Sequence, residues 1–442
     1  MGRSLPPTTT AQVEAVFDSP LIWDIASDVG DRIEGRRRRY PLSLHLAYGA
    51  LSRVYRSANR LDSEIIDGDL WTTIRRLHNE RSDQTIQPFA PKLTADSYRY
   101  ARDYLCSHEV LPTVVDSFTR RSVEIARQVG LLDPDGPGSR TRPDPSRVIY
   151  GDGTVVRPMY GPDAGRVDPD AAIHQRHDGS IVGNNLVTFA VRGSEPHLRV
   201  VLIAGRVPEP GQEAETAVGL LRTLVPIVGD GALAVVYDGA LRGVHHDAIL
   251  TELGLIVINK VHPAGNVDGQ RSWRTVMLGT WDHEPDGSRC VHTLAAHNGA
   301  VCETYLDHTG TLVLSNPLER RQIRRLPRSG GHRFSLGVDI PCPKQPFVAW
   351  VSPHRQPGDT GYGRPDQVRL IPPDDELFAE LYGLRNDSES INGRYKNTLY
   401  ARRASGLGWR RQLLDLISWA VASNSYAWAL HAANTAEVAA AA

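Results

Sequence analysis

The sequence predicts an α/β protein, with an all-α domain before the core and a β-rich segment inserted into it. Three observations lead to this prediction. Apolar residues recur with helical spacing over residues 41–132. From residue 147, short β-branched runs alternate with helical patterns, which is typical of a layered α/β core. A segment rich in Gly, Pro, Thr and Trp, residues 262–372, then separates this core from the last helical patterns.

Composition bounds the class of protein. The chain has 442 residues and a formal net charge of −1, so its overall charge does not indicate a nucleic-acid partner. Nearly all its cations are arginines, since lysine occurs only at Lys92, Lys260, Lys344 and Lys396. Codon usage in a GC-rich genome explains such a bias. The arginine guanidinium can also donate two parallel hydrogen bonds to a phosphate, which lysine cannot do. Local arginine clusters therefore indicate phosphate binding better than the net charge does.

The sequence lacks the features of secreted, membrane-spanning and nucleotide-binding proteins. Four cysteines do not make a disulfide framework in a chain of this length, which favours the reducing cytoplasm. The N-terminus lacks the pattern of a signal peptide, and no apolar run approaches the roughly 20 residues of a membrane span. No phosphate loop of the GxxxxGK[ST] kind occurs, so we expect no nucleotide cofactor. We expect a soluble intracellular protein without a membrane partner.

The N-terminal third reads as an arm followed by helices. Residues 1–40 end in Arg36 to Arg39, and this Arg-rich flexible arm either lies on DNA phosphate or is a solvated linker. Residues 41–132 predict four helices, which lie over 42–54, 65–77, 94–106 and 110–132. Arginines stud these helices, which suits recognition of DNA ends, although an ordinary helical bundle with a polar outside has the same pattern.

The core follows a Pro/Gly-rich linker over residues 133–146. Its first strand, residues 147–156, contains Asp152. The elements expected after it are two strands over 181–191 and 198–207, a helix over 213–228, a strand over 232–239, a short helix over 246–253 and a strand over 255–261. Three antiparallel strands followed by βαβ crossovers describe a ribonuclease-H-like core.

The inserted segment and the C-terminus complete the chain. Short strands at 275–278, 302–306 and 347–351 indicate that residues 262–372 form a mostly β subdomain. The acidic run from Asp374 to Glu376 is typical of a helix start. A closing helix is expected over 409–431.

Three acids form a candidate site. Asp152 and Asp238 lie in or at the end of apolar strands, where a carboxylate is costly without a charged partner. Glu389 lies between Arg385 and Lys396 on the helix expected after the insertion. These acids can converge at one sheet edge, where like charges repel unless cations are bound. Two Mg²⁺ ions about 3.5–4 Å apart would remove this repulsion.

The helix that carries Glu389 has two interpretations. On one continuous helix, Tyr382, Arg385, Glu389 and Lys396 would share a stripe about 60° wide. Residues 386–388 are good N-cap material, so the helix alternatively breaks there and leaves Glu389 in a first turn. A solvated face with an Arg385–Glu389 pair is the plainer alternative.

The spacing Tyr382-x2-Arg385-x3-Glu389-x6-Lys396 matches the Y-R-E-K signature of the insertion-sequence-four branch of DDE transposases. Asp152 and Asp238 resemble the first two acids of that family, and its members also carry a β-rich insertion before the Glu. The resemblance covers about residues 147–400. It implies that Asp152, Asp238 and Glu389 bind two Mg²⁺ ions, for which Mn²⁺ substitutes, and that Tyr382, Arg385 and Lys396 hold DNA phosphate.

The resemblance also implies a function and a domain plan. The function is cut-and-paste transposition by a homodimer, with cleavage at terminal inverted repeats and strand transfer to target DNA in the nucleoid. The family's hairpin mechanism uses insertion aromatics, for which Trp273, Trp281 and Trp350 are candidates unless they only pack the core. The plan is an arm (1–40), a helical DNA-binding domain (41–132), a linker (133–146), the first part of the catalytic core (147–261), the insertion (262–372), the second part of the core with Glu389 (373–400) and a C-terminal helical region (401–442).

Two other functions and one further site remain open at this point. A structure-selective endonuclease could share the core, and a domesticated transposase could act only as a DNA-binding protein. Residues Cys290, His292, His297 and Cys302 have the ligand types of a zinc site, although a one-residue gap between Cys290 and His292 is unusual and scattered Cys and His residues are common.

Overall fold

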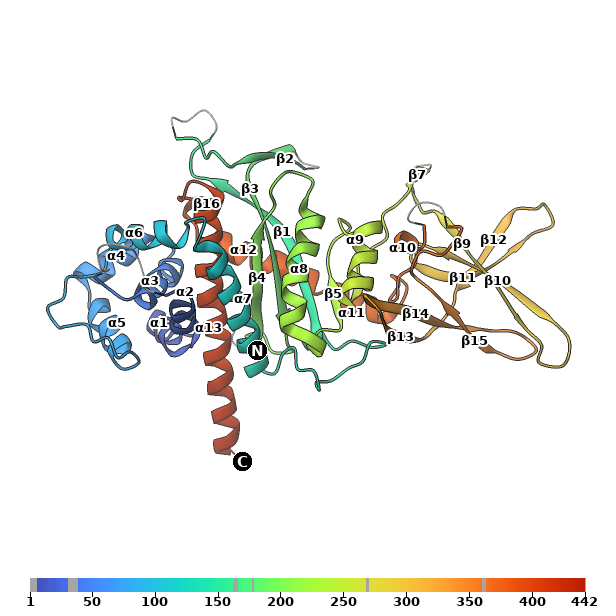
Figure 1. The fold of residues 1–442 in the computed structure, drawn as a ribbon, viewed down its shortest axis with the longest axis horizontal. Coiled ribbons are helices and arrows are strands. Elements are labelled where there is room, and N and C mark those ends of the chain that lie inside the picture. The colour runs from blue at the N-terminus through green and yellow to red at the C-terminus, as the bar shows by residue number, and fades with distance from the viewer. Residues whose placement is uncertain are drawn as a thin grey trace.

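A computed structural model describes residues 6–30, 39–161, 166–176, 179–267, 270–359 and 363–441. It contains both helices and strands in one chain, so the protein is of mixed α/β type, as the sequence predicts. Figure 1 shows a cluster of helices at one end, a sheet flanked by helices in the middle and a β-rich subdomain at the other end.

The N-terminal end of the described chain is helical. Its helices are α1 (Thr9–Asp18), α2 (Leu21–Val29), α3 (Leu42–Val54), α4 (Ala58–Asp67), α5 (Leu70–Asn79), α6 (Ala95–Leu105) and α7 (Leu111–Gln128). The helix expected over 65–77 is instead the end of α4 and most of α5, which Gly68 and Asp69 separate.

Part of the expected flexible arm is folded. Residues 9–29 form α1 and α2, because apolar side chains such as Val16, Phe17 and Ile22 are fully buried in the core. Burial of such side chains outweighs the entropy of ordering a short helix. Of the arginine run, Arg36 to Arg38 lie outside the described residues.

The central sheet has the strand order β2-β3-β1-β5-β6, with β4 also paired to β3 and β16 to β1. Strand β1 is antiparallel to β3 and parallel to β5, and β5 is parallel to β6. The short parallel strands are apolar throughout, since they are buried on both faces. The strands are β1 (Val148–Pro158), β2 (Ala172–Arg176), β3 (Gly179–Arg192), β4 (Arg199–Arg206), β5 (Ala234–Val236), β6 (Ile256–Ile258) and β16 (Arg403–Ala404).

Helices connect and cover the sheet. Helix α8 (Glu213–Val228) has the bounds that the sequence predicts and packs on β3 and β4. Between β5 and β6 the chain forms α9 (Gly243–Ala248), which continues into one π-helical turn, η3 (Ile249–Leu253). Figure 1 shows α8 in front of the sheet and α12, described below, behind it.

The insertion contains two larger sheets, a four-stranded one with the order β12-β11-β10-β9 and a three-stranded one with the order β13-β14-β15. All three strands expected there lie within observed strands. The elements are β7 (Gly265–Val267), β8 (Gln270–Ser272), β9 (Thr275–His283), β10 (Cys290–His297), β11 (Ala300–Leu306), β12 (Leu312–Pro317), β13 (Arg320–Arg328), β14 (Gly331–Ile340), β15 (Phe347–Val351) and α10 (Gly363–Gln367).

After the insertion the chain returns to the sheet through α11 (Glu376–Tyr382) and α12 (Arg385–Asn397). Asp375 caps α11 by accepting a hydrogen bond from the Leu377 backbone N–H at 2.9 Å, so the predicted acidic helix start is confirmed. The helix breaks at Gly383 and Leu384, which differs from both interpretations of this stretch.

Residues 386–388 stay helical because Asp387 is anchored. Its buried carboxylate accepts from Arg192 of β3 at 2.6 Å and pairs with Arg199 of β4 at 2.5 Å. An acid is also favourable in the first turn of a helix. Asp387 therefore fixes α12 to the sheet instead of ending it.

The last helix, α13 (Trp409–Ala441), joins the N-terminal helices to the sheet. It packs on β4, α3, α7 and α1. Buried Asn424 accepts from the Val201 backbone N–H at 2.9 Å, and its amide donates to the Val201 carbonyl at 2.8 Å and to Ser122 Oγ at 3.1 Å. Within the described residues, no helix is long and apolar enough to cross a membrane.

The segment over 133–146 is fixed at both ends. The buried Arg147 side chain donates to the carbonyls of Pro134 at 3.0 Å and Asp230 at 2.7 Å. Thr141 Oγ1 accepts from the Ile323 backbone N–H of β13 at 3.0 Å. The predicted linker thus connects the helical end of the molecule to the insertion as well as to the core.

We expect Asn424→Ala to lower the free energy of unfolding by about 1–3 kcal/mol, because both backbone groups of Val201 would lose their partner in a buried place. Urea unfolding followed by circular dichroism measures this change. Asn397→Ala, at an exposed position at the end of α12, is the control. An equal, small effect of both substitutions would contradict the role of Asn424.

Candidate metal centre

Three carboxylates meet at one edge of the central sheet. Asp152 lies within β1, Asp238 follows the end of β5, and Glu213 is the first residue of α8. One oxygen of each lies within 4.8 Å of the others. Strands β1 and β5 are parallel neighbours, which places the first two acids together as the sequence predicts. Oxygens at this separation can converge on one hard divalent cation after small side-chain rotations.

Hydrogen bonds hold the Glu213 carboxylate in place, and the lack of a side chain at Gly153 leaves room for it. Its carboxylate accepts from Asn185 Nδ2 at 2.8 Å and from the Tyr237 hydroxyl at 3.1 Å. A Cβ atom at Gly153 would lie 2.2 Å from Glu213 Oε2, so the carboxylate occupies the space that any other side chain there would fill. The two donors leave lone pairs of the carboxylate free for a cation.

Helix α12 supplies the polar groups beside these acids. Asn392 Nδ2 donates to Asp152 Oδ2 at 3.1 Å. Arg385, Glu389, Asn392 and Lys396 share one face of this helix, because they are spaced by four, three and four residues. Tyr382 is separate from this face, since it ends α11.

Glu389 is near the cluster but is not among the three converging acids. Its side chain is 57% exposed and pairs with Arg385 at 2.9 Å, so the i,i+4 ion pair of the plainer interpretation is present. The negative charge of Glu389 nevertheless acts on Asp152. The structure therefore brings together Asp152 and Asp238 with Glu213, and leaves Glu389 at the rim.

The predicted phosphate-binding residues lie on two helices, with Tyr382 at the end of α11 and Arg385 and Lys396 on α12. The Tyr382 ring stacks on Phe378 with centroids 5.0 Å apart, and Lys260 Nζ lies 5.2 Å from the Tyr382 ring centre. Lys396 is half-buried in the last turn of α12. Two of the three, Tyr382 and Arg385, interact electrostatically with Asp152 and Asp238.

The electrostatics of the centre follow from burial and crowding. Desolvation raises the pKa of Asp152 to about 7, Arg385 opposes the rise, and the charges of Glu213, Asp238 and Glu389 add to it. Burial alone would lower the pKa of Arg385, but the surrounding acids raise it overall. Without a cation, Asp152 is thus only partly ionised near neutral pH, and Arg385 is the guanidinium that interacts most strongly with it.

Glu213 was not predicted from the sequence. An acid in the first turn of a helix has an ordinary explanation in the helix dipole, so it carries no signal by itself. Two signals were available nearby: Tyr237, next to Asp238 in an apolar run, and Gly153, next to Asp152 in the strand. Tyr237 is fully buried, and burial followed by the Glu213 charge raises its pKa, so it remains a donor to Glu213.

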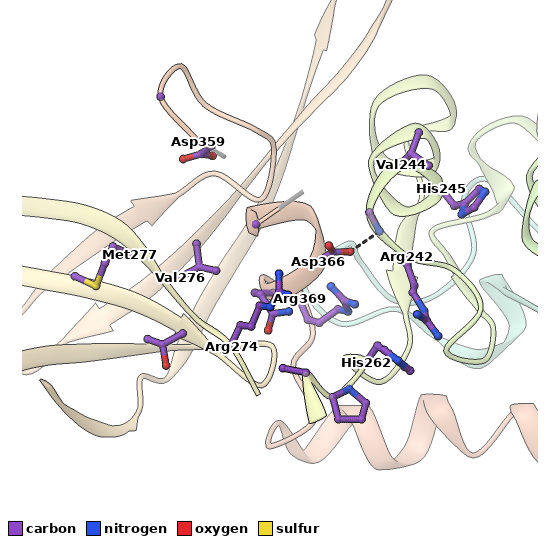
Figure 2. A pocket seen from close by; sticks show the side chains of 17 residues that line it. Arg242, Val244, His245, His262, Arg274, Val276, Met277, Asp359, Asp366 and Arg369 are labelled. Carbon is purple, nitrogen blue, oxygen red and sulfur yellow. Dashed lines mark hydrogen bonds between the residues drawn. The ribbon is translucent and has the colours of Figure 1, made fainter. Parts of the chain in front are cut away.

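A separate cavity of about 910 Å³ is lined by several arginines (Figure 2). It lies between α9, the loops that leave β5 and β6, and the insertion. Arg242, Arg274 and Arg369 line it from three separate segments, together with His245 and His262. Burial lowers the pKa of Arg369 to about 10, which leaves it charged at neutral pH. Two carboxylates, those of Asp359 and Asp366, also line the cavity, so it carries both signs of charge with a small excess of guanidinium groups.

The candidate tryptophans of the insertion have different surroundings. Trp273 contacts His297 edge-on, and Trp281 packs against the core. Trp350 carries Arg324 over its ring at 3.7 Å. Each has a packing partner, and the structure does not single out one of them for a base.

Comparison with known proteins assigns no family. No family model matches the chain, and no curated protein matches it at a significant level. The fold and the site define a mixed α/β protein with a carboxylate cluster suited to a hard divalent cation. The function is therefore argued from this geometry.

In metal-free protein, we expect Asp152→Asn to stabilise the fold at pH 8 and to have a smaller effect at pH 5. The folded-state pKa of about 7 lies above the ordinary 3.8. The stabilising effect of the bound proton is therefore complete below about pH 3.8 and is lost as the pH rises through about 7. The asparagine cannot ionise, so the gain at pH 8 has an upper bound of roughly 4 kcal/mol.

Urea unfolding in EDTA at both pH values measures this difference. Asp96→Asn, at a position that is 88% exposed, is the control. If Asp152→Asn is less stable than the unmodified protein at pH 8, the conclusion that burial and neighbouring acids disfavour the charge of Asp152 is wrong.

We expect Gly153→Ala to weaken Mn²⁺ binding by about 10–100-fold, because the new methyl group would displace Glu213 from the cluster. Isothermal titration calorimetry with Mn²⁺ measures the affinity. Gly219→Ala in α8, where a Cβ atom meets nothing within 4 Å, is the matched control. Unchanged affinity in Gly153→Ala would remove Glu213 from the site.

Proposed function

We propose that the protein is a DNA transposase of the DDE type, which cuts at transposon ends and joins them to target DNA. The observation that carries the proposal is the convergence of Asp152 and Asp238 with a third carboxylate beside the helix of Arg385 and Lys396. This arrangement pairs anionic metal ligands with cations for phosphate, as phosphodiester chemistry requires.

The sheet supports a ribonuclease-H-like core. The order β4-β3-β1-β5-β6, with three antiparallel strands followed by two parallel ones, is what the pattern of that fold predicts. The first acid lies in the central strand and the second follows the neighbouring parallel strand. The insertion separates these strands from the helix that carries Glu389, as in the resembling family.

The residues fit Mg²⁺ or Mn²⁺. Asp152, Asp238 and Glu213 would hold one ion, and exposed Glu389, whose charge acts on Asp152, is a further carboxylate for a second. Such ions, when bound, activate water or a 3′-hydroxyl and stabilise the leaving oxygen. The donor set consists only of oxygens, which suits these hard cations. The raised pKa of Asp152 means that binding releases a proton at neutral pH.

The chain's own cations would orient the DNA. Arg385 is next to the carboxylates and can hold a phosphate that lies against them, while Lys396 and Lys260 extend the positive rim on two sides. The exposed Arg242 and Arg274 of the cavity would receive the backbone of the same strand. Tyr382 between these groups can donate its hydroxyl to a phosphate oxygen.

The N-terminal helices would bind the transposon ends. Several of their arginines are engaged within the protein, such as Arg121 with Asp28 at 3.1 Å. Arg56, between α3 and α4, and Arg60, in the first turn of α4, are exposed and are the better candidates for DNA phosphate. Because two ends must be joined, we propose a homodimer on DNA in the nucleoid.

A cleavage and joining assay on the flanking DNA of the gene, with Mg²⁺ or Mn²⁺ against EDTA, tests the proposal. We expect metal-dependent nicking at a defined end followed by joining. Asp152→Asn and Asp238→Asn should each lower both steps at least about 100-fold. Cleavage of branched DNA without terminal repeats would favour a structure-selective nuclease, and binding without cleavage would favour a domesticated DNA-binding protein.

The same assay separates the two candidates for the third carboxylate. Glu213→Gln and Glu389→Gln are compared with Glu215→Gln, an exposed acid in the same turn as Glu213. Loss of activity only in Glu389→Gln would assign the family's Glu to catalysis and leave Glu213 a supporting role. Loss in both would indicate that each holds metal, and full activity in both would overturn the carboxylate centre.

A further inference from the structure

A second group of potential metal ligands lies in the insertion. It consists of His283 at the end of β9, His292 on β10 and Cys342 just after β14. One ligand atom of each lies within 4.8 Å of the others. A fourth residue, Cys290 at the start of β10, lies opposite His283 in the hairpin and interacts with the Cys342 thiol, although it is not one of the three residues within 4.8 Å. Two imidazoles and one thiol thus meet at one place, with a second thiol beside them.

The register of the hairpin explains why three of these residues meet. Cys290 pairs directly with His283 across β9 and β10, and His292 lies two residues further along the same strand. Residues opposite each other, and residues two apart, point to the same face of a sheet. Cys342 comes from the other sheet of the insertion, after β14, so it approaches this face from outside the hairpin.

Both imidazoles direct a buried nitrogen into the group. Nε2 of His283 and Nε2 of His292 are buried, and the Cys342 sulfur is the neighbour with which both imidazoles interact. His292 is only 7% exposed, and its Nδ1 lies 2.7 Å from Glu303 Oε1. A carboxylate that accepts the Nδ1 proton leaves the Nε2 lone pair free, as in most metal-bound histidines.

The surroundings of these side chains are consistent with reduced thiols in a shielded place. All four cysteines are free thiols, so Cys290 and Cys342 are not joined in a disulfide. The Phe347 ring lies 4.3 Å from the His283 ring centre and 5.5 Å from that of His292 and shields the group on one side. Buried lone pairs without a donor are costly, and a cation would remove this cost.

We propose that His283, Cys290, His292 and Cys342 bind one structural zinc ion. Two nitrogen and two sulfur ligands make a closed tetrahedral set, which is typical of structural zinc and leaves no position for a substrate. Mg²⁺ does not compete, because it prefers oxygen ligands. The ion would fasten the β9–β10 hairpin of the four-stranded sheet to the segment that follows β14 in the three-stranded sheet.

This set differs from the zinc ligands considered from the sequence. Cys290 and His292 belong to it, but His297 and Cys302 do not. His297 Nδ1 lies 3.1 Å from Thr275 Oγ1, and Cys302 is buried opposite Ala295. Both are therefore suitable controls.

The test is the zinc content of the full-length protein, prepared with zinc in the medium and without chelators and measured by mass spectrometry. We expect about one zinc per chain. His283→Asn and Cys342→Ser should lower the content at least about 10-fold, whereas Cys302→Ser and His297→Gln should keep it. The double variant Asp152→Asn/Asp238→Asn should also keep it, which separates this site from the carboxylate centre.

Cobalt substitution provides a second readout that needs no variant. Co²⁺ in the unmodified protein should give the intense visible bands of a tetrahedral ion and thiolate-to-cobalt charge transfer. Absence of zinc and of these bands, a Cys290–Cys342 disulfide in the intact protein, or unchanged zinc in Cys342→Ser would each overturn the proposal. None of these results bears on the transposase proposal, since the site shares no residue with the carboxylates.

Discussion

The repulsion among the carboxylates at the sheet edge is the constraint on which the rest of the site depends. Asp152, Glu213 and Asp238 meet at one place, and burial disfavours the charge of Asp152 in particular, so the cluster needs fixed positions and a nearby cation. The neighbouring side chains meet these needs. Asn185 and Tyr237 orient Glu213, Asn392 holds Asp152, and Arg385 supplies positive charge. A divalent cation would complete the same arrangement.

Helix α12 connects this centre to the rest of the fold. Asp387 on one of its faces is buried against Arg192 and Arg199 of the sheet, while Arg385 and Asn392 lie beside the acids. Ion pairs of one carboxylate with two arginines are directional, so they define the orientation of the helix on the sheet. The chain returns from the insertion with its register set by these contacts.

The insertion meets the rest of the molecule at the arginine-lined cavity and at the segment before β1. Segments of the core and of the insertion together line this cavity with Arg242 and Arg274. Thr141 and Arg147 bind the segment before the core to β13 and to the core itself. The proposed zinc ion would bind at the end of β9, and the beginning of the same strand lines this cavity.

The sequence by itself determined the order of the core elements from β1 to β6, apart from the short strand β2, because hydrophobic period and helix caps are local properties: α8 has its predicted bounds, and Asp375 caps α11. It also indicated Asp152 and Asp238, since an acid in an apolar strand stands out. Only the tertiary structure decided that Glu213 joins them and that His283 and Cys342 join Cys290 and His292. These residues are ordinary in their own segments, and they become ligands only because strand register and the return of distant chain segments bring their polar atoms together.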